Sequence, residues 1–363
     1  MTLGNYFIDR GKRGNTPALN RRADETFVEF CSDARNFLLH RRWASIGKLG
    51  NKIAEKNGVS IEHTTKCVEK LRDVIATSPE LATFLRTKRS FQEAYKDRII
   101  NSYNLCEEDW LRKLDAADKT GPGSVTYDLD FETPEYAKVE IHLQPKGYDG
   151  HDLAGLYYDY GTQIFFGGAA DADALHKGLA TKTASLVNGE VDRYLEIGCS
   201  CGQLACQLKT VYPNAEAWGT DISAAMVRYA HWRAIEHNFD VHFSQMASEN
   251  MDFPDNHFDL VTSHILFHEI PLPVIRETLN EVKRVLRPGG TFVIWDFGSS
   301  APDNPGYAGF LGLMDAADNC EPYAPGFVTC NIEGLLEETG FNLRDLGENG
   351  RQITGRVAEK PAA

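Results

Sequence analysis

The sequence predicts an α/β fold, in which helices cover both faces of a mainly parallel sheet and a mainly helical region precedes it. Three observations support this prediction. From residue 171 onward, short apolar runs alternate with amphipathic stretches, the pattern of repeated strand–helix–strand units. Within this part, Tyr194 to Asp221 reads as one complete strand–turn–helix–strand unit. From Asp24 to about Ala117, apolar residues recur with helical spacing instead.

The N-terminal region, residues 1–117, is predicted to fold as about five short to medium helices. Phe30 and Phe37 belong to one set of apolar residues at helical spacing. Gly58 and the pair Ser78-Pro79 are typical of helix boundaries. No catalytic constellation is evident here, so we expect this domain to serve dimerisation or to act as a lid.

Residues 118–170 are predicted to form a connecting and lid region. The segment DKTGPGS at its start indicates a turn or linker, and glycine, proline and aromatic residues are frequent after it. A dense set of tyrosines and histidines beside the predicted sheet is typical of a pocket wall, and Tyr157 and Tyr160 are candidate substrate contacts. A packed connecting layer would explain any single one of these residues equally well.

Residues 171–363 are predicted to form the catalytic domain. A helix over residues 171–188 leads into the sheet, and seven strands follow it, with helices between most of them. The predicted strands are 191–198, 215–221, 241–245, 257–263, 290–297, 341–347 and 351–357.

The turn after the first of these strands indicates a nucleotide-type ligand. Gly198 and Gly202 allow the backbone to approach a ligand closely. Asp221 ends the next strand 23 residues after Gly198, near the spacing of about 20 expected for a carboxylate that binds a ribose. The third glycine of a dinucleotide site is absent, and Glu196 would repel a phosphate but hold an ammonium group. An adenosyl ligand with a cationic amino-acid tail fits better.

Four segments resemble successive motifs of the class I S-adenosylmethionine-dependent methyltransferases: LEIGCSCG, AWGTDIS, FPDNHFDLVTSHILFHEIP and VLRPGGTFVIWD. The resemblance covers about residues 170 to 350. It implies a Rossmann-like, seven-stranded methyltransferase sheet that ends in an antiparallel hairpin, and S-adenosylmethionine as the cofactor. One departure lies in the turn, where the family usually has a middle glycine and this chain has Ser200.

The same resemblance assigns cofactor contacts. Glu196 and Gly198 would lie near the methionine part of the cofactor, and Asp221 would bind the ribose. The family's usual aspartate for the adenine amino group is replaced by Ala247, so that contact is expected from the two residues that follow it or from the backbone. The full set of predicted cofactor contacts is Glu196, Gly198, Gly202, Asp221, Ile222, Met226, Ala247, Ser248 and Ser263.

Three residues after the fourth strand are the predicted catalytic residues. In this fold the end of that strand faces the transferred methyl group, which makes His264 and His268 candidates, with Glu269 beside them. The segment is similar to the Leu-His-Asp-Trp region of the plant-type small-molecule O-methyltransferases, in which the histidine removes the acceptor's proton. His268 is therefore the predicted general base, because a histidine titrates near neutral pH. A purely structural histidine is the competing interpretation.

The segment after the fifth strand is expected to close the other side of the pocket, with Tyr307 and Met314 as substrate contacts. Cys199, Cys201 and Cys206 are conceivable soft ligands, but two of them lie in the cofactor turn, where small residues are required. No C-x-x-C pair or matching histidine spacing supports zinc. We therefore predict no metal site, and eight cysteines that remain reduced thiols.

Charge and hydropathy limit the kinds of molecule that the protein is expected to bind. Residues 1–113 carry 21 basic and 15 acidic side chains, and the remainder carries 17 and 37. An acidic catalytic part disfavours nucleic-acid substrates. No run of about 18 apolar residues is present to span a membrane, and the basic start lacks the apolar core of a secretion signal. We expect a cytoplasmic location, a small-molecule methyl acceptor and, from the helical N-terminal domain, a homodimer.

These features predict methyl transfer from S-adenosylmethionine to the oxygen or sulfur of a small-molecule acceptor. Two alternatives stay open. The segments FPDNHFDLV and VLRPGG also resemble enzymes that methylate carbon in a quinone-like ring. Ser200 and Ala247, in place of the usual glycine and aspartate, leave open a scaffold or sensor that binds the cofactor without transferring its methyl group.

Overall fold

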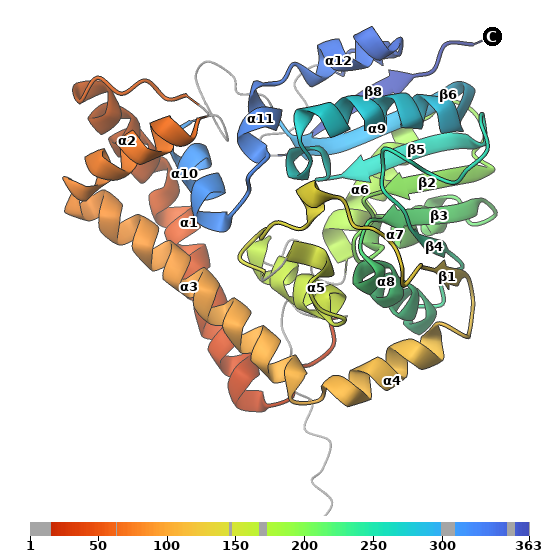
Figure 1. Ribbon diagram of the computed structural model, residues 1–363, viewed down its shortest axis with the longest axis horizontal. Coiled ribbons are helices and arrows are strands. Elements are labelled where there is room, and N and C mark those ends of the chain that lie inside the picture. Colours follow the sequence, from red (N-terminus) through yellow and green to blue (C-terminus); the bar gives the residue numbers. More distant parts are fainter. Residues whose placement is uncertain are drawn as a thin grey trace, which may run out of the picture.

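In the computed structural model, a sheet with its covering helices occupies one side of the molecule and long N-terminal helices occupy the other (Figure 1). The structure describes residues 16–62, 64–144, 147–166, 173–298, 309–346 and 353–362. Among these residues, no helix is both long and apolar enough to cross a membrane.

The sheet contains eight strands in the order β1-β4-β3-β2-β5-β6-β8-β7. β8 pairs antiparallel with both of its neighbours and the other pairs are parallel, which confirms the expected hairpin at the end of the chain. The strands are β1 Ser124–Thr126, β2 Arg193–Ile197, β3 Glu216–Asp221, β4 His242–Gln245, β5 Phe258–His264, β6 Leu286–Phe297, β7 Asn342–Arg344 and β8 Ile353–Glu359.

Seven of these strands lie where the sequence predicts them, and β1 corrects the predicted strand number. Its three residues pair with β4 from Ser124↔His242 to Thr126↔Ser244. A strand this short has too few alternating positions to give a periodic signal. Because β1 precedes residue 171, the sheet includes part of the segment predicted to connect the two domains.

Alternate side chains of the strands enter two separate cores. Leu195 and Ile197 of β2 pack under α9 and α12, whereas Tyr194 packs under α6, α7 and α8. Burial on both faces explains why the strands read as nearly continuous apolar runs. The covering helices are α6 Ala174–Leu186, α7 Gln203–Val211, α8 Ala224–Glu236, α9 Leu272–Val285 and α12 Ile332–Thr339.

The described residues of the predicted N-terminal domain form four helices instead of about five, because α1 runs unbroken for 35 residues. Its glycines do not end it. They make room for another helix, since a Cβ at Gly50 would lie 2.1 Å from a ring carbon of Phe310. The boundary at Ser78-Pro79 is confirmed, with the Ser78 hydroxyl capping the next helix. The helices are α1 Arg22–Lys56, α2 Thr65–Ala76, α3 Pro79–Asn104 and α4 Glu107–Ala117.

Short elements join the long helices to the sheet. α5 packs against α3 on one side and α8 on the other, and lies between the N-terminal helices and the sheet (Figure 1). α10 packs against α1 and α2, although it follows β6 in the chain. These elements are η2 Glu135–Ala137, η3 Gly147–Asp149, α5 Ala154–Phe165, η5 Phe267–Glu269, α10 Phe310–Asn319 and α11 Ala324–Thr329.

The strand order reverses beside β2. β3 and β4 continue the sheet on one side of β2, and β5 and β6 continue it on the other. In open parallel sheets, ligands bind in the crevice beyond the carboxyl ends of the strands at such a reversal. The ends of β2, β3 and β5, at Ile197, Asp221 and His264, are therefore the place to look for a site.

Candidate active site

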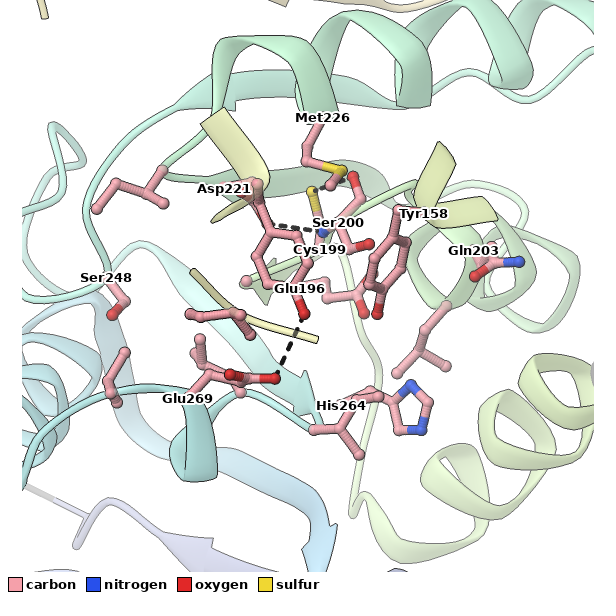
Figure 2. Close-up of a pocket in the computed structure, with 18 of the residues that line it drawn as sticks. Tyr158, Glu196, Cys199, Ser200, Gln203, Asp221, Met226, Ser248, His264 and Glu269 are labelled. Atoms are coloured by element: carbon pink, nitrogen blue, oxygen red, sulfur yellow. Dashed lines mark hydrogen bonds between the residues drawn. The ribbon is translucent and has the colours of Figure 1, made fainter. Parts of the chain in front are cut away.

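A large pocket opens at this reversal of strand order. Glu196, Gly198, Asp221 and His264 line it, together with residues of η3, α5 and η5 (Figure 2). The empty space within it, which includes space open to solvent, is about 1130 Å³. It lies beyond the carboxyl ends of the strands beside the reversal, where open parallel sheets bind ligands.

The glycine turn forms one wall of the pocket. Gly198, Ser200 and Gly202 all have positive φ, at 61°, 49° and 68°. A Cβ at Gly198 would lie 2.7 Å from Leu266, and one at Gly202 would lie 2.6 Å from Phe243, so neither position has room for a side chain. Gly202 shapes the turn from behind and is not among the lining residues. Ser200 adopts the left-handed conformation that the family's usual glycine would adopt more easily.

Asp221 is tied to this turn. Its carboxylate accepts hydrogen bonds from the backbone N–H of Ser200, at 2.9 Å, and of Ser223, at 3.0 Å. Burial raises the pKa of Asp221 to about 6, although these hydrogen bonds oppose the rise. The carboxylate lines the pocket where β3 ends, which is the position predicted for a ribose ligand.

Glu196 is the more deeply buried acid, with 2% of its surface exposed. Its Oε2 accepts a 2.7 Å hydrogen bond from the N–H of Ala205 in α7. Burial raises the pKa of Glu196 well above its ordinary value, and the charge of Asp221 adds to the rise. A cationic ligand group beside these two acids would favour their ionised forms, because an opposite charge stabilises a buried carboxylate.

The predicted adenine side is only partly assembled at the pocket. Ile222, Met226 and Ser248 line it, as predicted. Ala247 and Ser263 do not line it. The backbone of Ala247 forms an isolated bridge with residue 250, and the Ser263 side chain is fully buried in β5. These two residues, predicted to contact the cofactor, lie beside the pocket and not in its wall.

Two neutral histidines line the opposite wall. His264 is 8% exposed, its ring lies 5.1 Å from that of His176, and it stacks on Phe166. Burial lowers the pKa of His264 well below its ordinary value and that of His176 to about 3. Within the described parts of the chain, Nε2 of His264 and Nδ1 of His176 have no hydrogen-bond partner. Sequence reasoning missed His176, because a single histidine in an amphipathic helix gives no signal.

Glu269 lines the pocket, and His268 lies behind it. Nε2 of His268 is 3.4 Å from Oε1 of Glu269, and its Nδ1 is 2.8 Å from Oδ1 of Asp296. His268 is 2% exposed and is not among the lining residues. The predicted general base therefore lies behind Glu269 as seen from the pocket, and its role stays a prediction.

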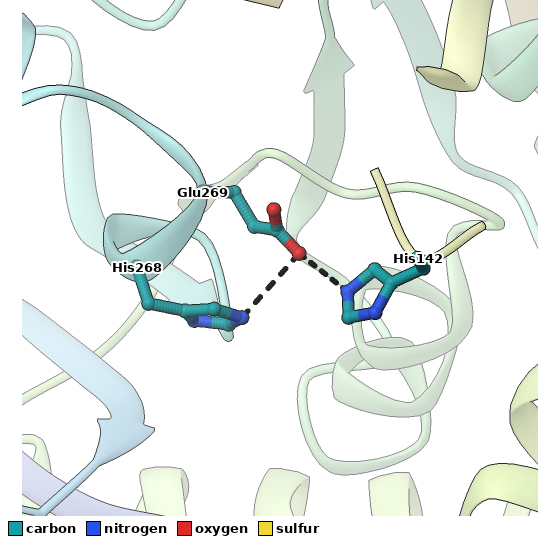
Figure 3. A group of neighbouring side chains, drawn as sticks. All are labelled: His142, His268 and Glu269. Atoms are coloured by element: carbon teal, nitrogen blue, oxygen red, sulfur yellow. Dashed lines mark hydrogen bonds and ion pairs between the residues drawn. The ribbon is translucent and has the colours of Figure 1, made fainter. Parts of the chain in front are cut away.

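A second histidine contacts the same carboxylate. Nε2 of His142 lies 2.6 Å from Oε1 of Glu269 (Figure 3). Burial alone would lower the pKa of His268, but Asp296 and Glu269 raise it well above its ordinary value. Burial alone would raise the pKa of Glu269, but His142 and His268 hold it below its ordinary range. The sequence analysis included His142 only as one member of the tyrosine and histidine set after residue 118. It did not identify Asp296, although an acid near the end of β6, beside β5, was a usable signal.

The predicted substrate tyrosines face away from the pocket. The Tyr160 hydroxyl donates to Glu25 of α1 at 2.6 Å, and the Tyr157 hydroxyl donates to Asn104 of α3. Tyr158, on the other face of α5, lines the pocket together with Tyr148. Residues three apart share a face of a helix, so the two predicted tyrosines belong to the packing with the N-terminal helices.

The remaining predicted residues lie elsewhere. Met314 is buried in α10 among residues of α1, α2 and α3 and does not line the pocket. Tyr307 lies outside the described residues. Cys199 lines the pocket, and burial raises its thiol pKa well above the ordinary value, as it does for Cys201. All eight cysteines are free.

Comparison with known proteins agrees with this geometry. Residues 195–290 match the family described as "Methyltransferase domain". A malonyl-[acyl-carrier protein] O-methyltransferase of Paenibacillus sp. (strain JDR-2) is 32% identical over 162 residues, 41% of this chain and 55% of that protein. A demethylmenaquinone methyltransferase of Thermus thermophilus is 34% identical over 105 residues, 29% of this chain and 47% of that protein. The chain thus spans about half the length of these relatives.

Among solved structures, a SAM dependent methyltransferase from Aquifex aeolicus aligns with a TM-score of 0.39 at 22% identity, covering 50% of this chain and 88% of that one. A phosphoethanolamine N-methyltransferase 2 of Haemonchus contortus, in complex with S-adenosyl-L-methionine, aligns with a TM-score of 0.41 at 17% identity over 51% of this chain and 52% of that one. Residues 195–290 thus match a methyltransferase domain, and this match together with the quoted sequence relatives supports a class I S-adenosylmethionine-dependent methyltransferase, with S-adenosylmethionine as its cofactor.

Proposed function

We propose that the protein transfers the methyl group of S-adenosylmethionine to an oxygen or sulfur atom of a small-molecule acceptor. The observation that carries this proposal is the continuity of the pocket. Glu196 and Asp221 line it at the glycine turn, and His264 and Glu269 line it on another side. A donor held at the first pair can meet an acceptor held at the second within one continuous pocket, and methyl transfer needs such alignment more than covalent machinery.

The charge of the pocket favours an acceptor without a negative charge. Four carboxylates line it, from Asp149, Glu196, Asp221 and Glu269, and no Lys or Arg is among the described lining residues. An acceptor with a free carboxylate or phosphate would find no cation there to pair with. Tyr148, Tyr158 and Phe166 supply flat apolar surface nearby, which suits a neutral aromatic molecule.

The proton of an acceptor hydroxyl or thiol has to leave as the methyl group arrives. We place this step at Glu269, because its carboxylate lines the pocket. The predicted general base His268 then acts with it as a pair: the imidazole lies 3.4 Å behind the carboxylate, and Asp296 holds the far nitrogen of the ring. His264, with its unpartnered Nε2, is proposed to bind the acceptor.

A second candidate is methyl transfer to ring carbon of a quinone-like acceptor. The observation in its favour is the similarity to the Thermus thermophilus demethylmenaquinone methyltransferase and to a ubiquinone/menaquinone biosynthesis C-methyltransferase of Bdellovibrio bacteriovorus, 31% identical over 107 residues. Such a ring in its reduced form carries a hydroxyl, so the same proton-accepting pair would serve. A scaffold that binds the cofactor without transfer is the non-enzymatic alternative.

Calorimetry and labelled transfer together separate these functions. The full-length chain is titrated with S-adenosylmethionine, and then supplied with methyl-labelled cofactor and a panel of phenols, thiols and reduced quinones. Labelled product is expected from a neutral aromatic hydroxyl or thiol, and NMR of the product shows whether oxygen, sulfur or carbon carries the methyl group. Lack of cofactor binding would overturn the proposal, and tight binding without transfer to any acceptor would favour the scaffold.

We also propose a homodimer formed through α1. Phe30 and Phe37 lie two helical turns apart and are 62% and 61% exposed, and Phe30 contacts Phe91 of α3. Aromatic side chains this exposed are typical of a contact surface. Sedimentation should give a dimer at micromolar concentration and a monomer for the Phe30→Ser, Phe37→Ser variant; a monomeric parent protein would contradict this. A cytoplasmic location and the lack of a nucleic-acid partner stay predictions.

A further inference from the structure

Two histidines from distant parts of the chain point at one carboxylate oxygen. Nε2 of His142 lies 2.6 Å and Nε2 of His268 lies 3.4 Å from Oε1 of Glu269 (Figure 3). The three ligand atoms lie within 4.8 Å of one another, and in the described part of the chain no other group of His, Cys, Asp and Glu is as close. We propose that His142, His268 and Glu269 bind a divalent transition-metal ion at the wall of the pocket.

Each histidine has a carboxylate behind it. Nδ1 of His268 lies 2.8 Å from Asp296, and Nδ1 of His142 lies 3.5 Å from Glu321. Both carboxylates are almost fully buried. A carboxylate hydrogen-bonded to Nδ1 fixes the orientation of the ring and leaves Nε2 free to bind a metal, and most histidine ligands in metalloproteins have such an outer-shell partner. Here both histidines have an outer-shell carboxylate, and both direct Nε2 at the same carboxylate oxygen of Glu269.

The backbone holds this outer shell in place. Asp296, at the end of β6, accepts hydrogen bonds from the N–H of Phe267 at 2.8 Å and of Phe297 at 2.7 Å. Phe267 and His268 are both in η5, so the carboxylate that orients the ring also anchors the element that carries it. Oε2 of Glu269 is buried and has no hydrogen-bond partner among the described residues. The carboxylate therefore has a second oxygen, beside the Oε1 that the histidines contact, to offer a bound ion.

The separations suit a small ion after a minor movement. With zinc–ligand distances of about 2.0–2.2 Å and tetrahedral angles, neighbouring ligand atoms lie about 3.3–3.5 Å apart. His268 and Glu269 already have this separation. Nε2 of His142 must move away from Oε1 of Glu269 by less than about 1 Å and, since the three ligand atoms lie within 4.8 Å of one another, closer to Nε2 of His268. Its side chain is 19% exposed in a loop, the least buried of the three. Two imidazoles and one carboxylate select Zn²⁺ or a similar transition metal over Mg²⁺ and Ca²⁺, which prefer oxygen ligands.

An ion at this site would have its open position toward the pocket, because Glu269 is the ligand that lines it. A catalytic role for the ion rests on the proposed function, whereas the binding of the ion to these three residues does not. An acceptor hydroxyl bound to the ion would lose its proton to water more readily. The oxygen's electron pair then forms the bond to the methyl carbon as the carbon–sulfur bond breaks, and sulfur keeps the electron pair of the broken bond and becomes a neutral thioether.

Metal titration without cofactor or acceptor tests the site directly. The full-length chain, freed of any purification tag and treated with chelator, is titrated with Zn²⁺ by calorimetry and with Co²⁺ by visible absorption. We expect one ion per chain and Co²⁺ bands of a four- or five-coordinate site. His142→Gln and Glu269→Gln should each weaken binding at least about tenfold, and Asp296→Asn by about 10–100-fold.

The controls make each outcome decisive. His40→Gln, on the exposed face of α1, should leave the metal affinity unchanged. Retained binding of S-adenosylmethionine by every variant shows that the domain is folded. No stoichiometric binding at micromolar protein, or binding that persists in both ligand variants, would overturn the metal site and leave a hydrogen-bonded cluster in its place. Stoichiometric metal binding without methyl transfer to any acceptor would count against the proposed function alone.

Discussion

The backbone N–H of Ser200 donates a 2.9 Å hydrogen bond to the carboxylate of Asp221. Ser200 follows β2 and Asp221 ends β3, so this bond joins the glycine turn after β2 to the end of β3. It places a carboxylate beside the turn. Because this hydrogen bond fixes the carboxylate relative to the turn, it reduces the ordering that binding has to impose.

Asp221→Asn should weaken the binding of S-adenosylmethionine. The amide keeps the shape and one acceptor oxygen but loses the charge that strengthens hydrogen bonds from a ribose diol. A hydrogen bond to a charged group contributes about 1.5–3 kcal/mol, so we expect a loss of roughly 10- to 150-fold, measured by calorimetry. Asp240→Asn, at an exposed position, is the matched control. An unchanged affinity in Asp221→Asn would remove the residue from the cofactor site.

Binding of S-adenosylmethionine should also depend on pH. Burial raises the pKa of Asp221 to about 6, so its carboxylate is mostly protonated at pH 5 and mostly ionised at pH 7.5. If the ionised form binds the ribose, affinity falls about tenfold between these values, since one pKa unit corresponds to a tenfold change in population. Glu196 also titrates in this pocket, so the parent protein alone does not show which acid causes the pH dependence. If Asp221 causes it, the affinity of the Asp221→Asn variant should depend less on pH than that of the parent protein. A parent profile as flat as the variant's would refute the assignment.

The raised pKa of Asp221 also predicts how the stability of the cofactor-free protein changes with pH. The folded-state pKa of Asp221 lies above its unfolded value, so the contribution to folding is fully present below about pH 4 and is lost as pH rises through about 6. Cofactor-free protein should therefore gain from Asp221→Asn at pH 7 and not at pH 4, an effect that chemical denaturation at the two pH values would reveal. Partial exposure of the residue at the pocket limits its size.

Ser200→Gly should stabilise the protein. Ser200 has φ of 49°, a left-handed conformation that costs a residue with a Cβ about 1–2 kcal/mol and glycine little. The greater chain entropy of unfolded glycine offsets part of the gain, which leaves roughly 0.5–1 kcal/mol. Urea unfolding measures it. Ser200→Ala keeps the Cβ and should show no gain, so equal stabilisation by alanine would mean that the hydroxyl, not the backbone, is responsible.

The strands and the glycine turn could be predicted because their signals are local. An apolar run that ends in two spaced glycines and then an aspartate specifies a strand, a tight turn and a ligand within 30 residues. The role of Gly50 in α1 has no such local signal. Gly50 leaves room for Phe310, which lies 260 residues away in the chain and becomes its neighbour only after folding.

The acceptor side could not be predicted for the same reason. His142 and Glu269 are 127 residues apart, and Asp296 reaches His268 because β5 and β6 pair side by side. No spacing in the sequence records these contacts. Tyr157 and Tyr160 were predicted to line the pocket, but Tyr158 lines it instead. Which face of α5 meets the pocket depends on the packing of α3 and α8 against the helix, and the sequence of α5 alone does not show it.

His264→Asn should separate acceptor binding from proton transfer. Burial keeps His264 neutral, with a pKa well below its ordinary value, so its ring is a weak base but can donate or accept one hydrogen bond through the unpartnered Nε2. Losing one such bond, worth about 0.5–1.5 kcal/mol, should raise the KM for the acceptor about 2- to 13-fold and change kcat little. Steady-state kinetics with an acceptor from the panel, and calorimetry showing unchanged cofactor affinity, would check this. His40→Asn is the control. A general base contributes about 10²- to 10⁴-fold to the rate, so a fall in kcat of that size would instead assign the proton transfer to His264 and take it away from Glu269 and His268.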